Sequence, residues 1–264
     1  MSAPAPAPAA TYTHFEDDHI RLMEEITSPP AQDLINQSGI LSDERDTIDV
    51  LDSAAGAGVV TALLKGHLKE KKGLKIVMGD LEKVMLDLAQ KRVDGQRWEN
   101  VEVKEANALS LPFEDSSFDY VLVNFGVQLF PDQDKAIAES YRVLRSSSVF
   151  GYTAWTVVPF ITLLRAVDPS FTVPPPFTAA VAHRSKLSPV LAKAGFSDIQ
   201  IEDVQASRKW AGAQEFLDDL KVTMAGLFQD EARNQKLVQK LRAEQGEGEV
   251  ELTWEGIAVT AKKA

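Results

Sequence analysis

The amino-acid sequence predicts an α/β protein in which helices cover both faces of a mostly parallel β-sheet. Through the first half of the chain, apolar strand-like runs alternate with segments whose apolar residues recur at helical spacing. One run, residues 118–123, is nearly all apolar, as expected for a strand that is buried on both faces. Of the 264 residues, 44% are hydrophobic and 25% are charged, which is the composition of a globular protein with a sizeable core.

The elements of this first half follow one another in a regular order. Strands are predicted at residues 48–51, 74–78, 101–106, 118–123 and 149–155. Helices are predicted between them, at residues 59–72, 81–93 and 135–144. Strand–helix alternation of this period is typical of a parallel sheet with helices on both of its faces.

The pattern changes after residue 155. Further helices are predicted at 185–194, 213–227 and 231–244, and two late strands at 199–204 and 251–259. We interpret residues 12–264 as a single domain. Within it we expect an N-terminal helical lid at 12–45 and cap or insert helices at 156–195 and 211–245. Residues 1–11 alternate alanine and proline, so we expect a disordered, extended tail there.

Composition also limits the function. The chain carries 28 basic and 39 acidic residues, a net charge of −11, which repels phosphate backbones and anionic lipids. We therefore expect no nucleic-acid and no membrane partner, but a small-molecule partner. There is no cysteine, which excludes disulfides, thiolate nucleophiles and zinc–thiolate sites. No stretch reaches the 18 or more apolar residues of a membrane span, and we expect a cytoplasmic protein.

A glycine turn follows the first predicted strand. Gly56 and Gly58 allow a close backbone approach, and the helix beyond them offers free N–H groups to a carboxylate or phosphate. Dinucleotide-binding enzymes have a third glycine where this chain has Thr61, which weakens that interpretation. The turn fits the pattern D-x-G-x-G-x-G better, with Asp52 as its acidic residue and Ala54 in place of its first glycine.

An aspartate ends the second predicted strand. Asp80 stands where a carboxylate can accept hydrogen bonds from both ribose hydroxyls of a bound nucleoside. It can equally cap the helix that is predicted to begin at Leu81, and the two roles can coexist.

Three segments together resemble class I S-adenosylmethionine-dependent methyltransferases. They are the glycine turn, residues 106–119, which resemble the family segment G-D-A-x-x-L-P-F-x-D-x-S-F-D, and residues 123–132. The closest resemblance is to fungal small-molecule methyltransferases of the gliotoxin thiol-methyltransferase type. It covers most of residues 46–262. It implies S-adenosyl-L-methionine as cofactor and a Rossmann-like sheet of seven strands with an antiparallel last strand.

The resemblance also implies roles for individual residues. Asn107 and Ala108 would read the adenine edge, and an amide can both donate to and accept from adenine. Asn107 can alternatively bond its own backbone in a loop. Asn124 and Phe125 would face the methionine part of the cofactor. The expected cofactor-binding residues are therefore Asp52, Ala54, Gly56, Gly58, Asp80, Leu81, Asn107, Ala108, Asn124 and Phe125.

The acceptor side of the site is less defined by sequence. Gln128, Trp155, Phe160 and Tyr12 are the expected acceptor-binding residues, and ordinary core packing is the alternative for Trp155 and Phe160. None of the four histidines follows the fourth strand, so no catalytic base is assigned. Positioning and desolvation would then carry the reaction, which favours a good nucleophile such as a thiol. We expect no metal site.

The sequence therefore predicts methyl transfer to a small organic acceptor, a secondary metabolite with a thiol or hydroxyl group. One alternative is a methyltransferase-like protein that binds the cofactor without methylating, as a scaffold or rearrangement catalyst. A second alternative is an NAD(P)-dependent oxidoreductase, which Thr61 and residues 106–119 disfavour. The oligomeric state stays open.

Overall fold

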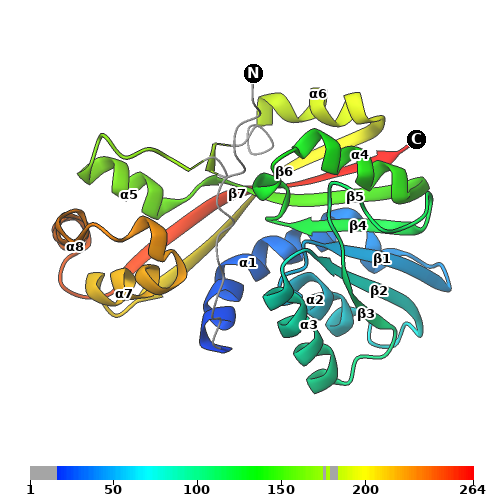
Figure 1. The fold of residues 1–264 in the computed structure, drawn as a ribbon, viewed down its shortest axis with the longest axis horizontal. Helices are drawn as coiled ribbons and strands as arrows, with labels where there is room; N and C mark the ends of the chain where they lie inside the picture. The colour runs from blue at the N-terminus through cyan, green and yellow to red at the C-terminus, as the bar shows by residue number, and fades with distance from the viewer. Residues whose placement is uncertain (1–16, 175–176, 179–183) are drawn as a thin grey trace.

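A computed structural model describes residues 17–174, 177–178 and 184–264. It contains one seven-stranded sheet, in the strand order β3-β2-β1-β4-β5-β7-β6 (Figure 1). The strands are β1 (Thr47–Ser53), β2 (Gly73–Asp80), β3 (Val101–Glu105), β4 (Phe118–Asn124), β5 (Leu144–Val157), β6 (Phe196–Trp210) and β7 (Val250–Lys263). Strands β1 to β5 pair in parallel, whereas β7 is antiparallel to both of its neighbours. The predicted fold class is therefore confirmed.

Helices cover both faces of this sheet. They are α1 (Asp17–Ser38), α2 (Val59–His67), α3 (Lys83–Gln96), α4 (Gln133–Val143), α5 (Pro159–Val167), α6 (Arg184–Ala194), α7 (Ala213–Thr223) and α8 (Glu231–Gln245). Helices α1, α2 and α3 pack on one face, in a core that includes Leu34, Leu64 and Val93. Helices α4 and α6 pack on the other face, in a core that includes Ile137 and Leu191.

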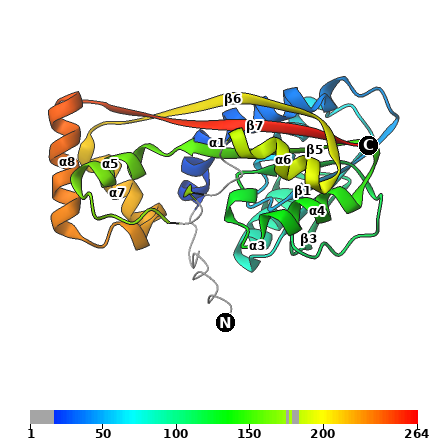
Figure 2. The ribbon, with the colours of Figure 1, turned by 90° about the horizontal axis from the view of Figure 1, so that it is seen from above.

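Strands β6 and β7 form a long antiparallel pair, which we call the hairpin although α7 and α8 lie between the two strands in the chain. Both strands are longer than the sequence predicts. Their pairing runs from Phe196–Lys263 to Trp210–Val250, with one register shift between Ser197 and Gln200. Many side chains of β6 are exposed, so its apolar residues form no continuous run from which the full length could be inferred. Beyond the end of β5 the hairpin leaves the main sheet and reaches a lobe formed by α5, α7 and α8 (Figure 2).

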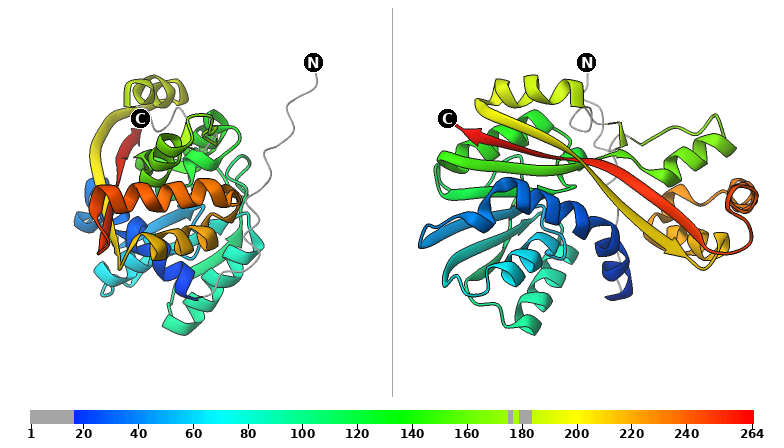
Figure 3. Two further views of the ribbon diagram at one scale, coloured as in Figure 1. Left: turned by 90° about the vertical axis from the view of Figure 1, so that its left-hand side faces the viewer. Right: turned by 180° about the vertical axis from the view of Figure 1, so that it is seen from behind.

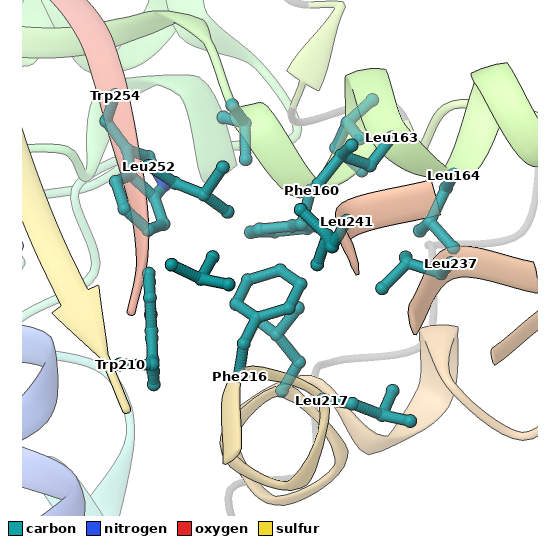
Figure 4. Close-up of a cluster of buried hydrophobic side chains, with 14 of the residues drawn as sticks. Phe160, Leu163, Leu164, Trp210, Phe216, Leu217, Leu237, Leu241, Leu252 and Trp254 are labelled. Atoms are coloured by element: carbon teal, nitrogen blue, oxygen red, sulfur yellow. The ribbon is translucent and has the colours of Figure 1, made fainter. Parts of the chain in front are cut away.

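This lobe has its own apolar core (Figure 4). Phe160 and Leu164 of α5, Phe216 of α7 and Leu241 of α8 are buried in it, beside Trp254 of β7. Helices α5, α7 and α8 fall within residues 156–195 and 211–245, where cap or insert helices are expected. Helix α6 lies inside the expected cap range 156–195 but packs on the main sheet beside α4.

Helix α1 changes direction part-way along its length (Figure 3). Pro29 and Pro30 lie inside it, and an interior proline removes a backbone donor and kinks a helix. The segment after the prolines packs on the sheet through Leu34 and Ile35, which are fully buried. The segment before them lies between the sheet and the lobe (Figure 3), at the edge where the parallel strands end. No helix in the described part of the chain is long and apolar enough to cross a membrane.

The docking of α1 gives a testable prediction for stability. Leu34 is fully buried, and its Cδ1 lies 2.9 Å from where a side chain on Gly151 of β5 would begin. We expect Leu34→Ala to lower the free energy of unfolding by about 3 kcal/mol, because it leaves a cavity against the sheet. Leu129→Ala, at a position that is 55% exposed, should change it by less than about 0.5 kcal/mol in the same urea titration. Equal losses for both variants would show that α1 is not packed as described.

Candidate active site

The carboxyl ends of β1, β2, β3 and β4 meet at one edge of the sheet, because these strands are parallel. Ligands of open α/β sheets bind outside this edge. All of the expected cofactor-binding residues lie at the ends of these strands or in the segments that follow them. We refer to this region as the cofactor edge.

The turn after β1 has an unusual backbone. Ala54, Gly56 and Gly58 all have positive φ angles, of 52°, 54° and 87°. For alanine this left-handed conformation costs about 1–2 kcal/mol, which explains the family preference for glycine at position 54. A side chain at Gly58 would begin 2.2 Å from Met78 Cε and would displace the end of that flexible side chain, but the φ of 87° by itself favours glycine here. A side chain at Gly56 would meet nothing closer than Met85 Sδ at 4.0 Å, so the front of the turn is open.

Asp52 holds this turn from behind. Its Oδ2 accepts hydrogen bonds from the backbone N–H of Thr61, at 3.1 Å, and from Thr61 Oγ1, at 2.7 Å. It thereby satisfies a free donor in the first turn of α2. The side chain is fully buried, and this burial raises the pKa of Asp52 to about 7 although both Thr61 bonds lower it. Position 61, where dinucleotide enzymes have glycine, is therefore used for a side-chain hydrogen bond.

Asp80 joins the end of β2 to the same turn. Its Oδ2 accepts from the N–H of Gly56 at 2.9 Å, and its Oδ1 accepts from the N–H of Glu82 at 3.0 Å. Glu82, not Asp80, is the N-cap residue of α3. Since each carboxylate oxygen has two lone pairs, both oxygens can accept a further bond. Beside Asp80, the apolar side chain of Leu81 is 54% exposed.

Asn107 and Ala108 lie in the loop after β3, next to Asp80. The N–H of Ala106 donates to the carbonyl of Asp80 at 2.8 Å, which fixes the two strand ends together. Asn107 Oδ1 accepts from the N–H of Leu109 at 2.9 Å, so the side chain does bond its own loop. The side chain of Asn107 is nevertheless exposed, and that of Ala108 is half-buried.

Asn124 is the last residue of β4, and Phe125 follows it. Thr153 Oγ1 donates to Asn124 Oδ1 at 2.7 Å and accepts from the N–H of Phe125 at 2.9 Å. Asn124 Nδ2 donates to the carbonyl of Thr27 in α1 at 3.2 Å. Phe125 has a φ of 57°, which is an outlier for a bulky residue. Its ring stacks on that of Trp155, with 3.8 Å between the ring centres and an interplanar angle of 13°.

Two contacts that the sequence did not reveal connect α1 to the glycine turn. Glu24 of α1 forms an ion pair with Arg92 of α3, and Arg92 also donates to the carbonyl of Ala57 at 3.1 Å. An open groove of about 270 Å³ lies beside this ion pair, lined by α1, Ala57 and α3. None of the residues predicted from the sequence lines that groove. No motif signals the ion pair, because its partners come from distant helices.

A second, smaller cavity of about 60 Å³ lies where α1, β5 and the lobe meet. Trp155 and Phe160 line it, as do Trp210, Trp254 and Asp219, which sequence reasoning did not single out. We refer to it as the aromatic cavity. Trp210 comes from the end of β6 that was missed when this strand was predicted too short, whereas Trp254 lies in the part of β7 that was predicted as a strand.

The other two expected acceptor residues are placed differently. Gln128 is buried and does not line this cavity. Its Oε1 accepts from the N–H of Trp155 at 2.8 Å, so it fixes the backbone of a residue that does. Tyr12 lies outside the described residues. Among the described residues there is also no group of three or more His, Asp or Glu side chains that could hold a metal ion.

This strand order, with an acidic residue and a glycine turn after β1, defines the Rossmann-like class of methyltransferase folds. The chain belongs to the ubiE/COQ5 methyltransferase family, which matches residues 31–172. The family assignment confirms the expected cofactor, S-adenosyl-L-methionine, and disfavours the NAD(P) alternative.

Curated relatives agree with this assignment. Methyltransferase tpcH of Aspergillus fumigatus is 30% identical over 139 residues, which are 52% of this chain and 49% of that protein. The ubiquinone/menaquinone biosynthesis C-methyltransferase UbiE of Rickettsia prowazekii is 32% identical over 135 residues, 50% of this chain and 54% of that protein. The match thus spans about half the length of these relatives.

Solved structures share the fold at low identity. The YcgJ protein of Bacillus subtilis has a TM-score of 0.62 and 19% identity, over 89% of this chain and 97% of that one. Phosphoethanolamine N-methyltransferase 2 of Haemonchus contortus, solved with S-adenosyl-L-methionine, has a TM-score of 0.53 and 19% identity, over 88% of this chain and 52% of that one.

The buried carboxyl of Asp52 predicts a pH-dependent stability. It releases its proton near pH 3.8 when unfolded and near pH 7 when folded, so the folded state holds the extra proton between these values. The stabilisation that protonation gives is complete below pH 3.8 and is lost as the pH rises to 7. We therefore expect the unfolding free energy of the wild type, minus that of Asp52→Asn, to fall by up to about 4 kcal/mol over this range and then to level off. A difference that is flat or rising in urea titrations from pH 4 to pH 8 would contradict this.

The left-handed conformation of Ala54 gives a second prediction. Glycine adopts this conformation without a Cβ clash, so we expect Ala54→Gly to raise the free energy of unfolding by about 1 kcal/mol. Its neighbour Ala55 is buried and has no positive φ, so Ala55→Gly should lower the unfolding free energy by about 1 kcal/mol. Thermal denaturation of both variants measures this. A destabilised Ala54→Gly protein would refute the assigned backbone strain.

Proposed function

We propose that this chain binds S-adenosyl-L-methionine at the cofactor edge and transfers its methyl group to a small organic acceptor held in the aromatic cavity. One observation carries the proposal: the stacked pair of Phe125 and Trp155 belongs to both places. Phe125 follows β4 at the cofactor edge, and Trp155 lines the cavity. A cofactor on one side and an acceptor on the other would therefore meet at these rings.

The residues at the cofactor edge suit the adenosine part of this cofactor. Asp80 is held by two backbone donors and keeps lone pairs for the ribose hydroxyls. The exposed side chain of Leu81 offers an apolar surface to a flat base, and the exposed amide of Asn107 offers polar atoms to its edge. The open space in front of Gly56 allows the ligand to approach the backbone.

Residues of the turn and of β4 would hold the methionine part. Asp52 keeps the turn and the start of α2 in place through Thr61. The rings of Phe125 and Trp155 offer aromatic faces that attract a cation such as a sulfonium. Asn124 couples this loop to α1 through Thr27, so α1 would help to close the site over the ligand.

When bound, S-adenosyl-L-methionine supplies a methyl group on positively charged sulfur, which passes to the acceptor atom as the carbon–sulfur bond breaks and the acceptor loses a proton. The task of the chain is to align the acceptor with that methyl group and to exclude water. Such alignment is worth about 7–11 kcal/mol in well-oriented reactions. The apolar walls of the cavity and the burial of Trp155 suit this task.

The acceptor atom that we expect is sulfur or oxygen, in a molecule of secondary metabolism. The C-methyltransferase among the relatives adds carbon to the atoms that need testing. The alternative function, cofactor binding without methyl transfer, uses the same cofactor edge and differs only in the outcome of the reaction.

The test is an assay with S-adenosyl-L-methionine that carries a deuterated methyl group. The purified full-length chain is incubated with this cofactor and a panel of aromatic thiols, phenols and activated aromatic carbons, and products are analysed by mass spectrometry. A product that carries one labelled methyl group supports the proposal. Cofactor that is bound but never consumed across the panel would favour the non-methylating alternative, and absence of binding would refute both.

The role of Asp80 gives a quantitative prediction. We expect Asp80→Ala to weaken binding of S-adenosyl-L-methionine at least about tenfold, because hydrogen bonds to a charged group are worth about 1.5–3 kcal/mol. Asp87→Ala is the control, since Asp87 lies exposed on α3 and pairs only with Lys83 among the described residues. Isothermal titration calorimetry measures both affinities, and circular dichroism checks the fold. Equal affinities for Asp80→Ala and wild type would remove Asp80 from the site.

A further inference from the structure

Asp219 supplies the one carboxylate among the described residues that line the aromatic cavity. Asp219 of α7 lines a cavity whose walls are largely apolar and include three of the four tryptophans of the chain. Its side chain is 22% exposed, and a partly buried polar group among apolar walls favours hydrogen-bond partners. The hydrogen bonds that each oxygen of this carboxylate accepts indicate what the cavity binds.

One oxygen of this carboxylate is fully used by the protein. Asp219 Oδ2 accepts from Arg208 Nη2 and from the indole Nε1 of Trp210, both at 2.5 Å. The guanidinium of Arg208 also lies over the ring of Trp210, 4.7 Å from its centre. The other oxygen, Oδ1, has no partner within the residues that the structure describes. Asp219 is thus held firmly through one oxygen while the other can accept.

The charges around the cavity select against ionic ligands. Arg208 is paired with Asp219 and also with Glu25 of α1, whose Oε2 lies 3.1 Å from Arg208 Nε. Its positive charge is therefore already balanced, and no free cation of the described lining remains to hold a carboxylate or phosphate ligand. A cationic ligand at Asp219 would in turn face the guanidinium that shares the same carboxylate. A neutral hydrogen-bond donor needs no free cation and is not repelled by the guanidinium of Arg208.

We propose that the cavity selects a flat aromatic acceptor that carries a neutral hydroxyl group, and that this hydroxyl donates a hydrogen bond to Asp219 Oδ1. The proposal rests on the proposed function, since it names the acceptor class of the same site. Tryptophan walls favour a planar ring, whereas the carboxylate favours a strong donor. A thiol is a weak donor, so a hydroxylated ring suits Asp219 better than the thiol that the sequence favoured. Asp219 is a specificity-determining residue in this account.

The test uses small fluorinated probes, because the cavity is small, about 60 Å³. Binding of 4-fluorophenol and of 4-fluoroanisole, which lacks the donor, is measured by fluorine NMR titration of the full-length chain. Titrations are run with and without saturating S-adenosylhomocysteine. We expect wild type to bind the phenol at least about tenfold more tightly than the anisole, the effect of one hydrogen bond to a charged group. Asp219→Leu should bring the two affinities within about twofold.

Two further variants control the experiment. Asp218→Leu changes the adjacent, exposed carboxylate of α7 and should keep the tenfold preference. The double variant Arg208→Met with Asp219→Leu removes both charges of the pair, so it leaves no buried charge unpaired if the single variant fails to fold. It too should lose the preference for the phenol.

Several outcomes would overturn the inference. They are equal binding of the two probes by wild type, no detectable binding of the phenol, tighter binding of 4-fluorobenzoate or 4-fluorobenzylamine, or a preference that survives in the double variant. These results are distinct from a failure of the proposed function. That failure is read from labelled methyl transfer and cofactor binding, whereas the probe preference is measured whether or not any methyl group is transferred.

Discussion

The candidate site depends on one close contact, between the turn after β1 and the loop after β4. A side chain at position 126 would begin 2.7 Å from the Cβ of Ala54, so the two loops can meet only because Gly126 has none. Beside this contact, Phe125 has a left-handed conformation and stacks on Trp155. Strain of this kind persists only where the surroundings over-determine it, and here the hydrogen bond to Thr153 and the stacked ring do so. The cofactor edge and the aromatic cavity are thereby brought to the same two rings.

Helix α1 links these two regions. Glu24 pairs with Arg92 beside the glycine turn, and the next residue, Glu25, pairs with Arg208 at the cavity. Partly exposed ion pairs contribute little stability, so their effect is to fix where the helix lies. The bend at the two prolines directs this segment away from the sheet and towards the lobe (Figure 3).

Sequence patterns predicted the parts of this molecule that follow local rules. The parallel strands carry short apolar runs, of which β4 is the most continuous, and the glycine turn matches a known motif. The hairpin of β6 and β7 was predicted too short, because its exposed face interrupts the apolar pattern. Asp219 was missed for a related reason. It lies on an ordinary amphipathic helix, and only the long hairpin brings it beside Arg208 and Trp210. Gln128 was singled out for its place after β4, but the direction of its side chain depends on the backbone of Trp155.

The central claim is that the cofactor edge holds S-adenosyl-L-methionine with its sulfur towards the stacked rings. A crystal structure of the chain with S-adenosylhomocysteine tests this most directly. The account predicts ribose hydroxyls within hydrogen-bond distance of Asp80, adenine against Leu81, and the sulfur facing the Phe125–Trp155 pair and the cavity behind it. A ligand bound elsewhere, such as in the groove between α1 and α3, or a sulfur that faces away from the cavity, would contradict the account.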